Sequence, residues 1–221
     1  MIDLADFAAV IFDMDGLVLD TESTYIKAWQ QTAEGMGFEL GDDFGQAISG
    51  LQHADVERLM LAHCGADFDL AAFNQLSASH WRANVEKDGI AVKAGFAQLL
   101  NIIKQQALPF ALATNSPKIN AHECLALAGL KDLFPLIVTC DDVQHGKPAP
   151  DIYLHTAACL QADIKQCLVI EDSPTGVAAA VNAGAFCVYV PSTFSIDAQA
   201  AKQSNWVVND LVELALAVSR A

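Results

Sequence analysis

Two aspartates lie one residue apart directly after an apolar run near the start of the chain, in the segment AVIFDMDG at residues 9–16. These residues are Asp13 and Asp15, and a second acidic pair, Glu171 and Asp172, ends the apolar run CLVI. A carboxylate placed after a buried strand can act as a nucleophile, as a general acid or base, or as a ligand of a hard cation. The two pairs therefore mark candidate catalytic or metal-binding positions.

Further polar residues follow other apolar runs. Thr114, Asn115 and Ser116 come after PFALA, and Lys147 lies in the segment HGKPAP. The carboxyl ends of parallel strands meet at one edge of a sheet, so these side chains would converge with the acidic pairs if the strands are neighbours. Carboxylates that lie so close repel one another unless a proton or a cation intervenes. Hard oxygen ligands suit Mg²⁺, and a nearby lysine would offset the charge of a bound phosphate.

The elements that must position these residues alternate along the chain. Continuous apolar runs, which are typical of strands buried on both faces of a parallel sheet, occupy residues 8–12, 109–114, 135–140, 167–172 and 186–190. Helical spacing of apolar residues marks 94–107, 117–128, 150–161 and 174–183, and Ser116 and Pro117 suit the N-cap and N1 positions of the second of these helices. This alternation predicts an α/β fold with right-handed crossovers.

One region interrupts the alternation. Between the first strand and the helix at 94–107, the pattern predicts helices near 22–36, 53–64 and 69–86 and no strand. We therefore predict an α/β core domain at residues 1–16 and 89–221 and an inserted α-helical cap domain at 17–88. Two chain crossings between the domains would form a hinge.

Composition limits the partners. The chain has 221 residues, 53% of them hydrophobic, and a formal net charge of −15. A surface this acidic repels nucleic acid and anionic membranes, whereas a small phosphorylated ligand could bind where a metal and a local cation compensate. No apolar run approaches the roughly 20 residues of a membrane helix, and the six cysteines form no C-x-x-C pair. Residues 1–10 have no basic segment followed by a long apolar run, so we do not expect them to be a signal peptide. We expect a cytoplasmic protein.

Plainer interpretations compete with chemistry at each position. A lone aspartate after a strand is usually a turn or cap residue, and a lone lysine is usually solvated. The combination of two acidic pairs at strand ends with Lys147 favours chemistry. A calcium-binding EF-hand loop would need Ile11 as its first ligand, which has no oxygen in its side chain, and HGKP lacks the upstream glycine and following Ser/Thr of a phosphate-binding P-loop.

Four motifs together carry a family resemblance: FDMDGLVLDTE, ATNS, GKPAPDIY and VIEDSPTGVAAAVNAG. In this order they resemble the haloacid dehalogenase superfamily, and more narrowly its β-phosphoglucomutase-like phosphatases. The likeness covers nearly the whole chain, and the four motifs are specific only as a set. It implies a Rossmann-like parallel sheet with a helical cap inserted after the first strand, and a Mg²⁺-dependent phosphatase acting on a small phosphorylated metabolite, with sugar phosphates favoured.

The resemblance also implies catalytic roles. Asp13 would attack phosphorus to form an aspartyl-phosphate. Asp15 would protonate the leaving alcohol and then deprotonate the attacking water. Thr114 and Asn115 would hold the phosphoryl oxygens, and Lys147 would bridge the phosphate and the Asp13 carboxylate.

The same resemblance implies the metal ligands. Mg²⁺ would be held by the carboxylates of Asp13 and Asp172 and by the main-chain carbonyl of Asp15. Glu171 would support the metal directly or through water. The family is often monomeric, so we expect a monomer.

Departures from the family pattern favour a phosphatase over the alternatives. True dehalogenases lack the second aspartate, which is present here as Asp15. The sugar mutases carry a histidine where Tyr25 stands, and a cap lysine and arginine where Ser49 and His53 stand. A phosphosugar mutase, and a non-catalytic module that binds phosphorylated ligands, stay open as alternatives. We expect Ser49, Gln52 and His53 to contact the substrate and to determine its identity.

Overall fold

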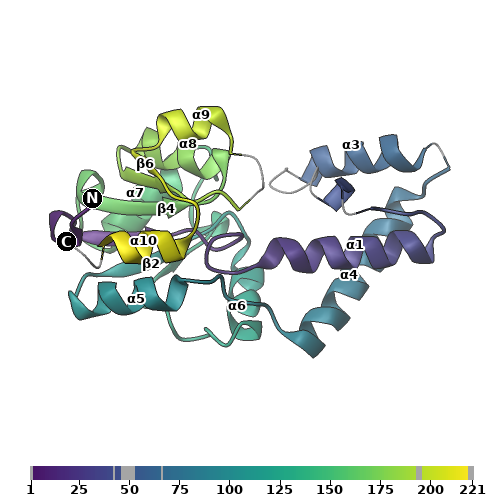
Figure 1. Ribbon diagram of the computed structural model, residues 1–221, viewed down its shortest axis with the longest axis horizontal. Coiled ribbons are helices and arrows are strands. Elements are labelled where there is room, and N and C mark those ends of the chain that lie inside the picture. Colours follow the sequence, from purple (N-terminus) through teal and green to yellow (C-terminus); the bar gives the residue numbers. More distant parts are fainter. Residues whose placement is uncertain (1, 42, 46–52, 66, 193–195, 219–221) are drawn as a thin grey trace. The chain divides into compact units, whose positions relative to one another are not determined.

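The computed structural model describes residues 2–41, 43–45, 53–65, 67–192 and 196–218. Two compact units make up the chain: Met1–Leu19 with Ala91–Ala221, called here the core unit, and Asp20–Ile90, called here the cap unit (Figure 1). The boundaries drawn from the sequence lay at 16/17 and 88/89. The segment up to Leu19 stays with the core unit because Leu19 forms β-bridges with Asp15 and with Val92.

A six-stranded parallel sheet forms the centre of the core unit. Its strands are β1 (Ala9–Phe12), β2 (Phe110–Ala113), β3 (Ile137–Val138), β4 (Cys167–Glu171), β5 (Phe186–Tyr189) and β6 (Trp206–Val207). They lie in the order β3-β2-β1-β4-β5-β6, and every pairing is parallel. The predicted α/β fold is confirmed. The chain moves from β1 through β2 to β3 and then returns to β4 on the other side of β1, so the topological switch point lies between β1 and β4.

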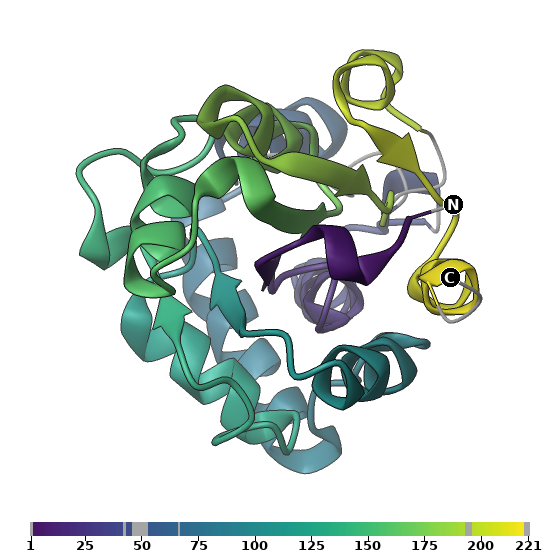
Figure 2. The same cartoon turned by 90° about the vertical axis from the view of Figure 1, so that its left-hand side faces the viewer.

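Helices cover both faces of this sheet (Figure 2). They are α5 (Phe96–Gln105), α6 (Lys118–Leu127), α7 (Asp151–Cys159), α8 (Pro174–Ala183), α9 (Ala198–Gln203) and α10 (Leu211–Val218), with short 3₁₀ turns at Leu4–Asp6, Cys140–Asp142 and Ile164–Gln166. Side chains of a strand alternate between the two faces. In β1, Ile11 belongs to the buried cluster that α7 and α8 cover, whereas the ring of Phe12 lies 5.5 Å from that of Phe96 in α5.

The observed elements differ from the sequence prediction in three places. Helix α6 begins at Lys118 with Pro117 at its N-cap, so Ser116 is not the cap that the sequence suggested. Strand β3 is confined to Ile137–Val138. Strand β6 and helices α9 and α10 were not predicted, because β6 and α9 are too short to show a periodic pattern and the α10 segment LVELALAV is apolar on several sides.

The regular secondary structure described in the cap unit is helical, as predicted. Its main helices are α1 (Thr21–Gly35), α3 (His53–Cys64) and α4 (Leu70–Asp88). A small core of Ala33, Leu40, Met60, Phe68 and Phe73 holds them together. Helices α1 and α4 are also joined by a hydrogen bond from Trp81 Nε1 to Thr24 Oγ1 of 2.9 Å.

No helix in the described part of the chain is both long and apolar enough to cross a membrane.

Gly95 gives a testable consequence of the packing between α5 and α10. It precedes α5 with a φ of +88°, and a Cβ atom there would collide with the main chain of Leu211 and Val212 at the start of α10. Gly129 has a similar φ of +73° but nothing within 4 Å of its Cβ position, so Gly129→Ala measures the left-handed backbone cost alone.

We predict that Gly129→Ala lowers the free energy of unfolding by about 1–2 kcal/mol. Gly95→Ala should cost about 1–3 kcal/mol more, because the main chain of α10 must move. Urea denaturation of the two variants and the wild type measures the difference. Equal losses in both variants would show that α10 does not pack against Gly95.

Candidate active site

The switch point between β1 and β4 positions the first set of candidate residues. Asp13 directly follows β1, and its main-chain N–H donates to the carbonyl of Ile170 in β4 at 3.0 Å. Glu171 ends β4 and Asp172 follows it. Carboxylate oxygens of Asp13, Glu171 and Asp172 lie within 4.8 Å of one another. The structure therefore brings Asp13 of the first acidic pair together with both residues of the second pair. They meet at the switch point, which is where α/β sheets bind ligands.

Lys147 lies between two of these carboxylates. Its Nζ contacts Asp13 Oδ1, donates to Glu171 Oε1 at 2.6 Å and donates to the carbonyl oxygen of Ala113 at 3.1 Å. The residues Lys147, Asp13 and Glu171 are 8%, 6% and 0% exposed. All three N–H groups of the ammonium thus have oxygen acceptors in a buried environment, which fixes the position of its charge.

Asp15 has partners of a different kind. Its Oδ2 accepts hydrogen bonds from Thr114 Oγ1 at 3.1 Å and from Ser116 Oγ at 2.8 Å. The main-chain N–H of Ser116 donates in turn to Thr114 Oγ1 at 3.0 Å. The loop after β2 therefore holds one oxygen of Asp15 with two neutral hydroxyls. Ser116 was predicted to cap the helix that follows the strand end, and its contact with Asp15 was not predicted.

Asn115 joins the loop after β2 to the loop that carries Lys147. Its Nδ2 donates to the Lys147 carbonyl at 3.1 Å, and the Lys147 N–H donates to its Oδ1 at 2.8 Å. A Cβ atom at Gly146 would lie 2.7 Å from that Oδ1, so the close approach needs glycine there. The side-chain amide of Asn115 therefore positions the lysine loop.

Gly16 and Gly176 make room for the carboxylates. Gly16 has a φ of +81°, and a Cβ atom there would collide with Asp172 Oδ2. At Gly176, in the first turn of α8, a Cβ atom would collide with the Glu171 carboxyl group. A side chain at either position would displace a carboxylate of the cluster.

Glu171 is held on both of its oxygens. Oε1 accepts from Lys147 and from the Tyr153 hydroxyl, and Oε2 accepts from Asp172 N–H at 3.1 Å, Ser173 N–H at 3.3 Å and Ser173 Oγ at 3.2 Å. Ser173 is also the N-cap of α8. Tyr153 and Ser173 were not among the residues predicted from the sequence. The signal for Ser173 was its place before Pro174, a usual helix start, whereas Tyr153 has no pattern that separates it from a core residue.

The carboxylates outweigh the ammonium charge among these buried groups. Burial raises the pKa of the Asp13 carboxyl to about 8, with Glu171 and Asp15 adding to the effect and Lys147 opposing it. Burial acts to lower the pKa of Lys147, but the charges of Asp13 and Glu171 outweigh it, so the pKa of the lysine is raised. The site therefore favours a bound positive charge, either a proton or a metal ion.

The donor set suits a hard divalent cation. Asp13 and Asp172 offer carboxylate oxygens on either side of the switch point, with Glu171 in the same cluster. Oxygen ligands of this type are what Mg²⁺ takes in proteins. Because both oxygens of Glu171 already accept several hydrogen bonds, Asp13 and Asp172 are better placed than Glu171 to bind a metal directly.

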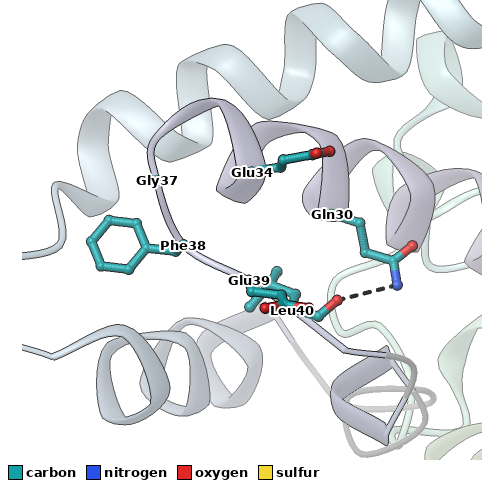
Figure 3. A pocket seen from close by; sticks show the side chains of 6 residues that line it. All are labelled: Gln30, Glu34, Gly37, Phe38, Glu39 and Leu40. Atoms are coloured by element: carbon teal, nitrogen blue, oxygen red, sulfur yellow. Dashed lines mark hydrogen bonds between the residues drawn. The ribbon is translucent and has the colours of Figure 1, made fainter.

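The structure describes little of the predicted substrate-contacting residues of the cap unit. Ser49 and Gln52 lie outside the described residues. His53 is the first residue of α3, and its side chain is not among those described. A separate hollow of about 480 Å³ lies within the cap unit, between the end of α1 and the segment after it (Figure 3). Its described lining residues include the carboxylates of Glu34 and Glu39, which are unsuited to a phosphate.

The raised pKa of Asp13 predicts how the metal-free protein responds to pH. The folded protein holds a proton on Asp13 up to about pH 8, whereas the unfolded chain loses it near the ordinary value of 3.8. The stability that this group contributes is therefore present below about pH 4 and is lost as the pH rises towards about 8.

We expect the wild type in EDTA to lose unfolding free energy over this pH range relative to Asp13→Asn, which cannot titrate there. Urea denaturation at a series of pH values measures the difference. Parallel profiles for the two proteins would contradict the prediction. Excess Mg²⁺ should reduce the difference, since a bound cation replaces the proton.

Comparisons with known proteins find relatives that cover most of this chain. A phosphorylated carbohydrates phosphatase of Thermotoga maritima is 32% identical over 82% of this chain and 83% of its own length. A beta-phosphoglucomutase of Bacillus subtilis is 30% identical over 82% of each chain. The structure of a HAD family hydrolase from Deinococcus radiodurans R1, determined with bound phosphate and sodium, matches with a TM-score of 0.82 and 27% identity, covering 98% of this chain and 96% of that one.

The sequence model of the haloacid dehalogenase-like hydrolases matches residues 7–184, which include every candidate residue discussed above. The match thus extends across β1, the cap unit and β4, and agrees with the four motifs from which the resemblance was drawn. The chain belongs to the haloacid dehalogenase-like hydrolase family.

Proposed function

We propose that the protein is a Mg²⁺-dependent phosphomonoesterase that hydrolyses a small phosphorylated metabolite, a sugar phosphate, through an aspartyl-phosphate on Asp13. The observation that carries the proposal is the different surroundings of two carboxylates: Asp13 contacts the Lys147 ammonium, and Asp15 accepts from two hydroxyls. A relative named as a phosphorylated carbohydrates phosphatase supports the substrate class.

Asp13 is the proposed nucleophile. An oxygen of its carboxylate attacks phosphorus, the bond from phosphorus to the ester oxygen breaks, and an acyl-phosphate forms. Lys147 favours the charged, nucleophilic form of Asp13 and offsets the charge of the incoming phosphoryl group. A bound Mg²⁺, held by Asp13, Asp172 and the Asp15 carbonyl, would supply further electrostatic stabilisation of the phosphoryl oxygens.

Asp15 is the proposed general acid and base. Thr114 and Ser116 both donate to Oδ2, so the proton that Asp15 delivers is expected on Oδ1. It passes to the leaving alkoxide in the first step. In the second step Asp15 takes a proton from the water that attacks the acyl-phosphate, which releases phosphate and restores Asp13.

The proposed phosphate contacts come from the loop after β2 and from Lys147. Since the Asn115 side chain bonds to the main chain of Lys147, we assign its predicted phosphate contact to its main-chain N–H. The hydroxyl of Thr114 and the ammonium of Lys147 complete the set. Ser49, Gln52 and His53 stay the predicted substrate-contacting residues of the cap, and a monomer stays the predicted state.

A phosphosugar mutase is the second candidate, since a beta-phosphoglucomutase is among the relatives. Tyr25 favours the phosphatase, because the mutases have histidine there. Its ring is stacked on that of Trp81, with centroids 5.3 Å apart and planes 7° apart, so it packs within the cap unit and carries no basic nitrogen. Free phosphate as the product supports hydrolysis, whereas an isomeric sugar phosphate supports the mutase.

One prediction of the proposed function concerns the nucleophile and the metal. Phosphate release from a panel of phosphorylated sugars, nucleotides and other small metabolites should need Mg²⁺ and stop with EDTA. Asp13→Asn should lower kcat by at least about 1,000-fold, because the amide cannot form the acyl-phosphate.

Asp132→Asn is the matched control, since it makes the same change at an exposed aspartate of the core unit. It should leave kcat unchanged. Substantial turnover by a folded Asp13→Asn protein would exclude Asp13 as the nucleophile.

A further prediction distinguishes the role of Asp15 as the general acid from that of Asp13 as the nucleophile. Asp15→Asn should lower kcat for an alkyl phosphate by about 10²–10⁴-fold, since the alkoxide then leaves without a proton. An aryl phosphate such as p-nitrophenyl phosphate needs no such help. Rapid mixing should therefore show a burst of p-nitrophenolate close to one per enzyme, followed by slow turnover. Equal losses for both substrates, without a burst, would contradict the role of Asp15.

A further inference from the structure

Tyr153 makes two contacts with the charged cluster that the proposed chemistry does not use. It lies in the first turn of α7, a few residues after Lys147, and is 0% exposed. Its hydroxyl donates to Glu171 Oε1, the oxygen that also accepts from Lys147. The face of its ring lies 5.1 Å from Lys147 Nζ. One side chain thus contacts both the ammonium and the carboxylate that anchors it.

A buried tyrosine at this position lowers the stability of the fold unless its hydroxyl makes a good hydrogen bond. The side chain belongs to the apolar cluster between the sheet and α7, where phenylalanine would fill the same space. Burying a hydroxyl has a desolvation cost that only a good hydrogen bond offsets. The acceptor is a carboxylate that already receives the Lys147 ammonium, so the hydroxyl completes the donors around that oxygen.

Tyr153 is linked to the proposed nucleophile through two intermediate side chains, Glu171 and Lys147. Glu171 Oε2 is held by Asp172 N–H, Ser173 N–H and Ser173 Oγ, which leaves Oε1 to be positioned by Tyr153 and Lys147. Lys147 has a flexible four-carbon stem, so its ammonium position depends on the groups around it. A displacement of about 1 Å at a reacting group can reduce rate by about 10²-fold.

Resting on the phosphatase activity proposed above, we propose that Tyr153 is a positioning residue that holds the Lys147 ammonium against Asp13, through its hydroxyl on Glu171 and through its ring face. Tyr153 touches neither substrate nor the reacting atoms in this role. It acts through Lys147, so its loss should affect the chemical step more than substrate binding.

The kinetic test compares two buried hydroxyls of α7. Tyr153→Phe should lower kcat about 10–100-fold, as removal of an outer partner of a metal or charged site typically does, with KM little changed. Tyr153→Leu should lower kcat further, because it also removes the ring face. Thr156→Val is the control: Thr156 is 0% exposed, and its Oγ1 donates to the Ile152 carbonyl at 2.6 Å and not to a carboxylate of the cluster.

Thr156→Val should lower the unfolding free energy and leave kcat unchanged. Unchanged kcat in Tyr153→Phe would overturn the proposal. So would equal kcat losses in Tyr153→Phe and Thr156→Val at equal losses of stability, since that result means a general packing role.

A second measurement needs no turnover, and its main result comes from the wild type. In nitrogen-15 NMR spectra of the wild type, the Lys147 ammonium should give a slowly exchanging signal with its protons shifted upfield by the Tyr153 ring, and Lys147→Arg assigns it by its disappearance. Where Tyr153→Phe folds, the signal should keep its ring shift and exchange faster. The absence of a ring-shifted signal in the wild type overturns the positioning role.

The two proposals fail in different ways. If the wild type releases no phosphate from any compound of the panel, the mutase and the binding module are favoured over the phosphatase, and the ammonium signal alone decides the role of Tyr153. If phosphate is released but the Lys147 signal shows no ring shift, the phosphatase stands and the positioning role falls.

Discussion

The balance of charge around Lys147 is the constraint on which the rest of the site depends. Asp13, Glu171 and Asp172 are buried and close together, and the ammonium of Lys147 contacts the first two. The carboxylate charge exceeds that of the lysine, which is why the Asp13 pKa rises when no cation is bound. The folded protein must therefore take up a proton or a metal ion. A site with an excess of buried negative charge is suited to binding Mg²⁺ together with an anionic phosphate.

The fold supplies this charge cluster by topology and by close packing. Two neighbouring strands, β1 and β4, end side by side at the switch point, which places Asp13 beside Glu171 and Asp172. Glycine then allows the carboxylates to approach the main chain, at Gly16 for Asp172 and at Gly176 for Glu171. The main-chain N–H groups of Asp172 and Ser173, which lead into α8, donate to Glu171 and hold its carboxylate at the strand end.

Apolar runs mark the strand ends in the sequence, so the convergence of the main candidate residues could be predicted on the condition that those strands are neighbours. The strand order that meets this condition is known only from the structure. The sequence was not sufficient to predict the partners of each side chain. Ser116 has the pattern of a helix cap, yet its hydroxyl bonds to Asp15. Tyr153 has the pattern of a core residue, yet its hydroxyl bonds to Glu171. Such pairs, separated by 101 and 18 residues, depend on tertiary packing that local patterns do not encode.

The partners of Asp13 and Asp15 explain how two aspartates so near in sequence can be given opposite proposed tasks. A nucleophile must be charged. The Lys147 ammonium favours the charged form of Asp13, but burial outweighs it and raises the pKa, so a bound cation is needed as well. A general acid must carry a proton, and hydroxyl donors on one oxygen leave the other oxygen available for it. The strand geometry of β1 and the turn at Gly16 direct Asp13 towards Lys147 and Asp15 towards the loop after β2. The proposed division of labour therefore follows from the neighbouring loop that each carboxylate meets.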